Sequence, residues 1–192
     1  MGPFNIGKAK TDGTGTEAGK MKKGYVHVFT GNGKGKTTAA IGLSIRAAGA
    51  GMKIFFGQFV KKGEYSEIKA LKRFDDAITV EQFGLGRFTH ERPKLEDIQA
   101  ARRGIERVTA VIASGRYDMV ILDEANVAVK LGLFPVQELL GLIINKPPEL
   151  ELVITGRYAS PRIIEMADMV TECQARKHYY DLGTKARVGI EK

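Results

Sequence analysis

The sequence contains a single cysteine, Cys173, so no disulfide can form within the chain. A reducing interior is the simplest setting for such a protein, and we expect a cytoplasmic location. No uncharged apolar run approaches the roughly 18 residues that a membrane-spanning helix needs. The N-terminus also lacks the apolar core of a signal peptide. We therefore expect no membrane partner.

Acidic residues are fewer than basic ones, and the formal net charge is +8. A positive charge favours nucleic-acid binding, but five lysines and two acidic residues in residues 1–24 account for +3 of it. The remaining charge is spread along the chain. Basic and aromatic residues do not interleave, and no RNA-binding signature is present. We expect no nucleic-acid partner, because a polyanionic small ligand such as a nucleotide would need only a few of these cations.

Residues 1–23 are rich in Gly, Lys and Thr and show no apolar periodicity. This composition predicts a flexible N-terminal tail, and a flap that orders over a bound ligand is the alternative. The rest of the chain, residues 24–192, is long enough for one domain with a sizeable core.

From Gly24 onward, short β-rich runs alternate with helical patterns. This alternation predicts a three-layer α/β fold with a mostly parallel central sheet and helices on both faces. The pattern of residues 36–50 is that of a buried helix, and the tail from residue 177 shows no clear element. The predicted strands cover residues 25–30, 52–60, 78–83, 119–122, 150–155 and 169–172, and the predicted helices 36–50, 64–74, 95–112, 135–144 and 161–167.

Residues 30–38 (TGNGKGKTT) lie between the first predicted strand and the first predicted helix. In a phosphate-binding loop, glycines let successive backbone N–H groups face phosphate oxygens, a lysine neutralises them, and a hydroxyl residue holds magnesium. Lys36 is the candidate phosphate lysine and Thr37 the candidate magnesium ligand. A glycine-rich turn with chance lysines is the weaker interpretation, given the flanking elements. The candidate ATP-binding residues of the loop are Gly31, Asn32, Gly33, Lys34, Gly35, Lys36, Thr37 and Thr38.

Thr30 occupies the position where such a loop usually has its first glycine. Gly31 and Gly33 carry the bend instead. This departure leaves room for a phosphate pose that differs from that of a kinase or GTPase.

The run Asp118 to Glu124 (DMVILDE) is an apolar strand that ends in two acidic residues. Beside a phosphate loop, Asp123 and Glu124 are candidate magnesium ligands. The second acid could instead polarise a water, as in an ATPase, and the pair could also be the acidic N-terminus of a helix.

Two arginines are candidate ATP contacts. Arg157 follows the predicted strand 150–155, so it could reach the crevice at the strand ends, although an exposed surface arginine is equally compatible. Arg46 lies within an apolar helical pattern, where a charge should be paired or should reach a ligand.

At these residues the sequence resembles the P-loop ATP:cob(I)alamin adenosyltransferases, also called corrinoid adenosyltransferases. The resemblance covers nearly the whole chain from about Tyr25 onward. The matching segments are VFTGNGKGKTTAAIGLSIRAAGAGMK, QFVKKGEYSE, DMVILDEANVAVKLG, LVITGRYASPRIIEMADMVTE and KHYYDLGTKARVGIE.

The resemblance implies transfer of the 5′-deoxyadenosyl group of ATP to the cobalt of a reduced corrinoid, cob(I)alamin, in adenosylcobalamin synthesis or salvage. Triphosphate is released, and Mg²⁺ or Mn²⁺ assists. The family also implies a RecA-like fold, a homodimer, a transient flavoprotein reductant, and ATP bound with its triphosphate reversed relative to ordinary P-loop enzymes. Cobalt(I) is itself the nucleophile, so the implied catalytic residues are Lys36, Thr37 and Glu124, with Glu124 as a metal ligand.

In that family, aromatic side chains of the loop after the third strand line the lower face of the corrinoid and favour loss of its lower axial ligand. The matching positions here are Phe88 and His90. Phe88 fits the pattern, whereas His90 stands where a tryptophan is common. Its imidazole could exclude the axial ligand, could coordinate cobalt and oppose the four-coordinate state, or could simply be an exposed loop side chain.

Three other functions are compatible with parts of the sequence. A P-loop ATPase or phosphotransferase would cleave ATP at the γ-phosphate. A nucleic-acid motor would need a second lobe for which the chain has no room. A corrinoid carrier that delivers its product to a client enzyme is compatible with catalysis.

Overall fold

The structure, a computed structural model, describes residues 22–86 and 92–191 of the 192-residue chain. Of the predicted flexible tail, residues 1–21 lie outside the described residues. Within the described ranges, no helix is long and apolar enough to cross a membrane.

The described residues form a six-stranded sheet in the order β3-β2-β4-β5-β1-β6, with every pair of neighbours parallel. This arrangement confirms the predicted α/β fold. Each strand lies within a residue or two of a predicted one, except that the second is shorter than predicted. The strands are β1 Val26–Thr30, β2 Ile54–Gln58, β3 Ile78–Gln82, β4 Met119–Asp123, β5 Glu151–Thr155 and β6 Met169–Glu172.

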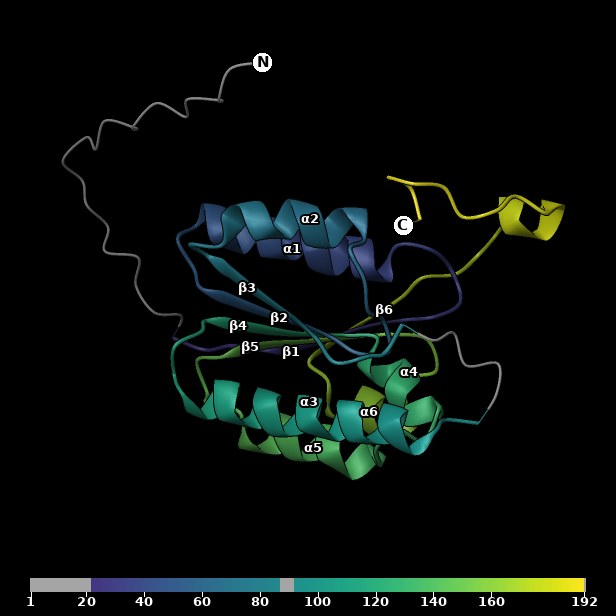
Figure 1. The fold of residues 1–192 in the computed structure, drawn as a ribbon. Helices are drawn as coiled ribbons and strands as arrows, with labels where there is room; N and C mark the ends of the chain where they lie inside the picture. Colours follow the sequence, from purple (N-terminus) through teal and green to yellow (C-terminus); the bar gives the residue numbers. More distant parts are fainter. Residues whose placement is uncertain (1–21, 87–91, 192) are drawn as a thin grey trace, which may run out of the picture.

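Helices cover both faces of the sheet: α1 and α2 lie on one face, and α3, α5 and α6 on the other (Figure 1). The helices are α1 Lys36–Gly49, α2 Ser66–Leu71, α3 Leu95–Ala113, α4 Ala125–Lys130, α5 Val136–Asn145 and α6 Pro161–Met166, with the 3₁₀ turns η1 Lys72–Phe74 and η2 Tyr179–Leu182.

Alternation along the central strands builds two cores. Phe56 and Ile121 face the α1 side, whereas Phe55 and Val120 face the α3 side. Every residue of β2, β4 and β5 is buried, because both faces of a parallel sheet are covered. The edge strand β6 is exposed along its whole length.

Three details differ from the sequence predictions. Helix α1 is buried on one side only, so Ile45 and Arg46 are exposed. The many small residues of α1 made its sequence apolar on every side, but the sheet covers only one stripe of the helix. Helix α4 was not predicted; two of its six residues are β-branched valines, which have a low helix propensity. The C-terminal tail contains the 3₁₀ turn η2.

Candidate active site

The candidate site lies at the carboxyl ends of β4, β5 and β1, which are adjacent in the sheet. The predicted phosphate loop, residues 30–38, follows β1, the acidic pair lies at the end of β4, and Gly156–Arg157 follows β5. In open parallel sheets the carboxyl ends of the strands form the usual ligand crevice. The fold therefore brings the three sequence-predicted segments to one edge.

The phosphate loop turns directly into α1. Gly31 has a φ of 91° and Gly35 a φ of 125°, a region that residues with a Cβ rarely adopt. Helix α1 has 14 residues and no side-chain cap at its N-terminus. Its first backbone N–H groups are therefore available to an anion, and the helix dipole favours negative charge there.

The segment after β6 packs closely against this loop. A Cβ on Gly31 or Gly33 would lie 2.5 or 2.8 Å from the carbonyl oxygen of Cys173. The Gly33 N–H donates to that oxygen at 2.6 Å, and the Cys173 N–H donates to the Thr30 carbonyl at 2.8 Å. These two glycines therefore permit the approach of a neighbouring chain segment, in addition to any role in phosphate binding.

Lys36 is buried, with 8% of its surface exposed, and its Nζ donates to the Gly33 carbonyl at 2.6 Å. Burial lowers the pKa of Lys36, and the charge of Arg157 lowers it further. Arg157 is exposed, yet it is close enough to Lys36 to act on it. The charges of Lys36 and Arg157 thus act on each other.

Asp123 is fully buried and receives three side-chain hydrogen bonds. Thr37 Oγ1 and Thr155 Oγ1 donate to Oδ1 at 2.9 and 2.6 Å, and Gln58 Nε2 donates to Oδ2 at 2.9 Å. Gln82 in turn donates to Gln58 Oε1 at 2.8 Å. The structure thus brings the predicted metal ligands Thr37 and Asp123 together.

Glu124 adopts a left-handed backbone conformation, with φ 59° and ψ 18°, immediately before α4. Its N–H donates to Thr155 Oγ1 at 3.0 Å. Such conformations are costly for residues other than glycine and are concentrated at functional sites. The turn directs the chain from β4 into α4 and leaves the Glu124 side chain beside Asp123.

Lys61 was not singled out in the sequence, yet it contacts both acids. Its Nζ lies 3.3 Å from Glu124 Oε1 and 3.9 Å from Asp123 Oδ2. Burial alone would lower the pKa of Lys61, but the two carboxylates outweigh it and raise the pKa above its ordinary value. The ammonium group stands beside the acidic pair where a metal ion would compensate the same charges.

The donor set fits magnesium. In residues 22–86 and 92–191 no three His, Cys, Asp or Glu side chains are grouped to hold a metal. Mg²⁺, however, is commonly bound through one or two carboxylates together with water and substrate phosphates. A hydroxyl and two carboxylates at a phosphate loop match that chemistry.

Lys34 has contacts that its position in the loop did not suggest. Its Nζ lies within hydrogen-bond distance of Tyr179 Oη (3.3 Å), the Ile190 carbonyl (2.8 Å) and Glu191 Oε1 (2.8 Å). An ammonium group has three N–H donors, so these contacts use all of them. Arg187 also donates to Glu191. We call the segment 178–191 the C-terminal strap, because Lys34 ties it to the phosphate loop.

The other predicted residues are less closely associated. Asn32 and Thr38 are exposed. Arg46 is exposed about 15 Å further along α1 at 1.5 Å per residue, so the argument that it lies in a buried helix was wrong, while its contact with ATP stays a prediction. Phe88 and His90 lie outside the described residues.

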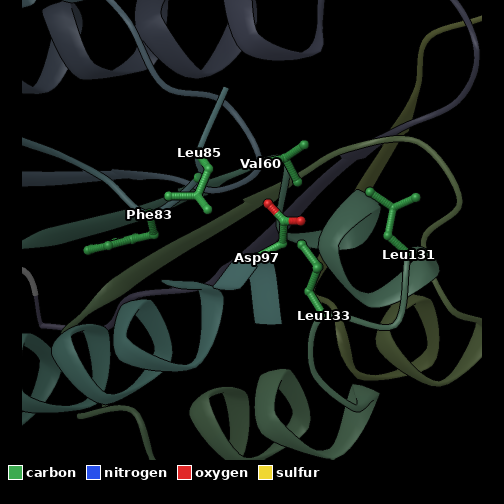
Figure 2. A pocket seen from close by; sticks show the side chains of 7 residues that line it. Val60, Phe83, Leu85, Asp97, Leu131 and Leu133 are labelled. Atoms are coloured by element: carbon green, nitrogen blue, oxygen red, sulfur yellow. The ribbon is translucent and has the colours of Figure 1, made fainter. Parts of the chain in front are cut away.

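A small pocket lies at the turn that precedes Lys61. It is lined by Val60, Phe83, Gly84, Leu85, Asp97, Leu131 and Leu133 (Figure 2). Val60 lines this pocket, and the next residue, Lys61, contacts the acidic pair. Asp97 is held by the Lys94 N–H at 3.1 Å, at the start of α3.

Comparison with known proteins identifies similar chains. The family model of the ATP:corrinoid adenosyltransferases BtuR/CobO/CobP matches residues 22–191. The corrinoid adenosyltransferase of Escherichia coli K12 is 35% identical over 185 residues, which cover 96% of this chain and 93% of that protein. The one from Pseudomonas aeruginosa is 34% identical over 171 residues, 88% of this chain and 84% of its own. The corrinoid adenosyltransferase CobA of Salmonella typhimurium is 34% identical over 171 residues, which cover 88% of this chain and 86% of that protein.

Proposed function

The chain belongs to the ATP:corrinoid adenosyltransferase family, and we propose that its residues 30–38 hold the triphosphate of ATP as the leaving group of that reaction. Enzymes of this kind transfer an adenosyl group from ATP to a corrinoid, so those two molecules are the substrates. The observation that carries the proposal is the convergence of Lys36, Arg157 and the Thr37–Asp123 pair on one loop.

The reaction needs no nucleophile from the protein. The reduced cobalt of cob(I)alamin supplies the electron pair that forms the bond to ribose C5′, and the C5′–O bond breaks. Triphosphate leaves with the electrons of that bond. The protein must align the reacting atoms and stabilise the charge that develops on the leaving group. We assign this stabilisation to Lys36, Arg157 and the N–H groups at the start of α1.

We propose that Thr37, Asp123 and Glu124 hold Mg²⁺ or Mn²⁺ at this site. A bound divalent cation would neutralise part of the charge on the triphosphate. Asp123 is supported in this role by the three side chains that fix its orientation. Glu124 is a ligand in this proposal and not a base that activates water.

The corrinoid side of the proposal rests on the family resemblance. We propose that Phe88 and His90 lie against the lower face of the corrinoid, with His90 in the place of the usual tryptophan. We also propose a homodimer, a flavoprotein that supplies the electrons for cobalt reduction, and a cytoplasmic location, since cobalt(I) needs a reducing environment.

Product analysis tests the role of the loop. The protein is incubated without oxygen with ATP, Mg²⁺ and chemically reduced cobalamin. We expect the spectrum of a cobalt–carbon bond and one triphosphate per adenosylated corrinoid. Orthophosphate released without any corrinoid, with no triphosphate, would show instead that the loop supports cleavage at the γ-phosphate.

A further inference from the structure

Lys61 is held in place by its backbone. Beyond the end of β2, the Phe59 N–H still donates to the Asp123 carbonyl at 2.9 Å, so the chain continues alongside β4. The Lys61 N–H then donates to the Phe59 carbonyl at 2.6 Å and closes a three-residue turn around Val60. A Cβ on Gly84 would lie 2.2 Å from the Val60 carbonyl carbon and 2.6 Å from the Lys61 nitrogen. Residues 60 and 61 are therefore fixed between two neighbouring segments.

In this turn Val60 adopts an unfavourable backbone conformation. Its φ is 66°, a left-handed conformation that is uncommon for any residue with a side chain and a genuine outlier for a β-branched one. Such strain persists only where the surroundings over-determine it. The turn places Val60 in the lining of the pocket in Figure 2 and Lys61 at the acidic pair.

The Lys61 ammonium lies at the acidic pair and at no other described acid within ion-pair distance. It is 3.3 Å from Glu124 Oε1 and 3.9 Å from Asp123 Oδ2, and 23% of its side chain is exposed. The Asp123 side chain is fully buried, and its other partners are neutral hydroxyl and amide groups. A buried carboxylate without a compensating cation is strongly unfavourable. Lys61 is the cation in ion-pair contact with this pair, and the charge of Lys36 also acts on it.

We propose that Lys61 is a positioning residue of the transfer reaction: it is the resident counter-cation of Asp123 and Glu124, and a divalent cation displaces it on binding. The inference rests on the metal role proposed above for these two acids. A divalent cation at these carboxylates repels the ammonium that lies against the same oxygens, so arrival of the metal moves the ammonium away. The flexible four-carbon stem of lysine permits that movement.

The first test measures metal affinity, with no substrate present. Binding of Mn²⁺ alone is followed by electron paramagnetic resonance for the wild type, Lys61→Met and Lys61→Arg. Removing the competing charge should tighten binding by Lys61→Met about tenfold, which corresponds to about 1.4 kcal/mol, whereas Lys61→Arg keeps the charge and the wild-type affinity. Lys69→Met is the matched control, because Lys69 pairs with Glu64 at 3.7 Å on the exposed surface. Unchanged or weaker binding by Lys61→Met overturns the proposal.

A second measurement uses only the wild-type protein, in case the variants do not fold. The lysines are labelled with an amine-reactive reagent, with and without Mn²⁺, and the labelling of Lys61 is read by mass spectrometry. Displacement predicts a several-fold rise at Lys61 and none at Lys69. No rise at a saturating Mn²⁺ concentration overturns the proposal.

Asp123→Asn separates this inference from the metal site itself. If that variant binds Mn²⁺ as tightly as the wild type, the metal role of the acidic pair is wrong. If Asp123→Asn abolishes binding while Lys61→Met and the wild type bind equally, only the role of Lys61 is wrong.

Discussion

Replacing Thr155 by valine removes one hydroxyl from the centre of the site and keeps the shape of the side chain. Thr155 is fully buried, and its Oγ1 donates to Asp123 Oδ1 at 2.6 Å while accepting the Glu124 N–H at 3.0 Å. A hydrogen bond to a charged group contributes about 1.5–3 kcal/mol, and a partly buried N–H left without its acceptor costs about 1 kcal/mol more. We expect Thr155→Val to lower the free energy of unfolding by about 3 kcal/mol.

Thermal unfolding followed by circular dichroism measures this loss. For a chain of this length, about 3 kcal/mol corresponds to a fall of about 6–12 °C in Tm. Thr171→Val is the control, because Thr171 is exposed in the edge strand β6 and surface substitutions usually change stability by less than about 0.5 kcal/mol. A loss from Thr155→Val no larger than that of the control would refute the assigned hydrogen bonds.

Three further predictions concern the loop and its surroundings. Lys36→Ala should abolish formation of the cobalt–carbon bond in the anaerobic assay, because the leaving triphosphate then loses the buried cation of the loop; near-normal turnover would contradict the loop assignment. Phe88→Ala should slow the reaction of complete cobalamin more than that of a corrinoid without the lower base, and equal losses on both would argue against a role at the axial ligand. The partners of Glu191, first Arg187 and then Lys34, lower the pKa of Glu191 below its ordinary value of 4.5. The contacts of Glu191 that tether the strap are therefore fully present above pH 4.5 and are lost only as the pH falls through the lower pKa of the folded state. Hydrogen exchange in the C-terminal strap should stay slow down to pH 4.5 in the wild type and should be fast at pH 7 in Glu191→Gln. Similar exchange in both proteins would disprove the tether.

The elements that position the site could be predicted from the sequence because their signals are local. Strand β4 is an uninterrupted apolar run that ends in Asp123, and Glu124 follows it directly. The loop 30–38 is recognisable by its glycines and by the strand and helix that flank it. Parallel strands place their carboxyl ends on one edge, so the meeting of Thr37 with Asp123 followed from the predicted topology.

The contacts of Lys61 and Lys34 could not be predicted, because they depend on distant segments or on backbone strain. Nothing in the run of residues 58–63 (QFVKKG) indicates that Val60 adopts a left-handed conformation. Lys34 sits in the loop like a phosphate ligand, yet its ammonium contacts Glu191, 157 residues later. The local sequence shows that a lysine is present, but it does not show which anionic group the lysine contacts in the folded chain.

The attachment of the phosphate loop to the C-terminal strap also has a consequence for biosynthesis. Glu191 is translated 157 residues after Lys34. At about 5–20 residues per second, this delay lasts roughly 8–30 s. Strand β1 likewise waits for its neighbours β5 and β6. The nascent loop therefore lacks the partners that shape it until Glu191 has been translated, and only then can it adopt the contacts described above.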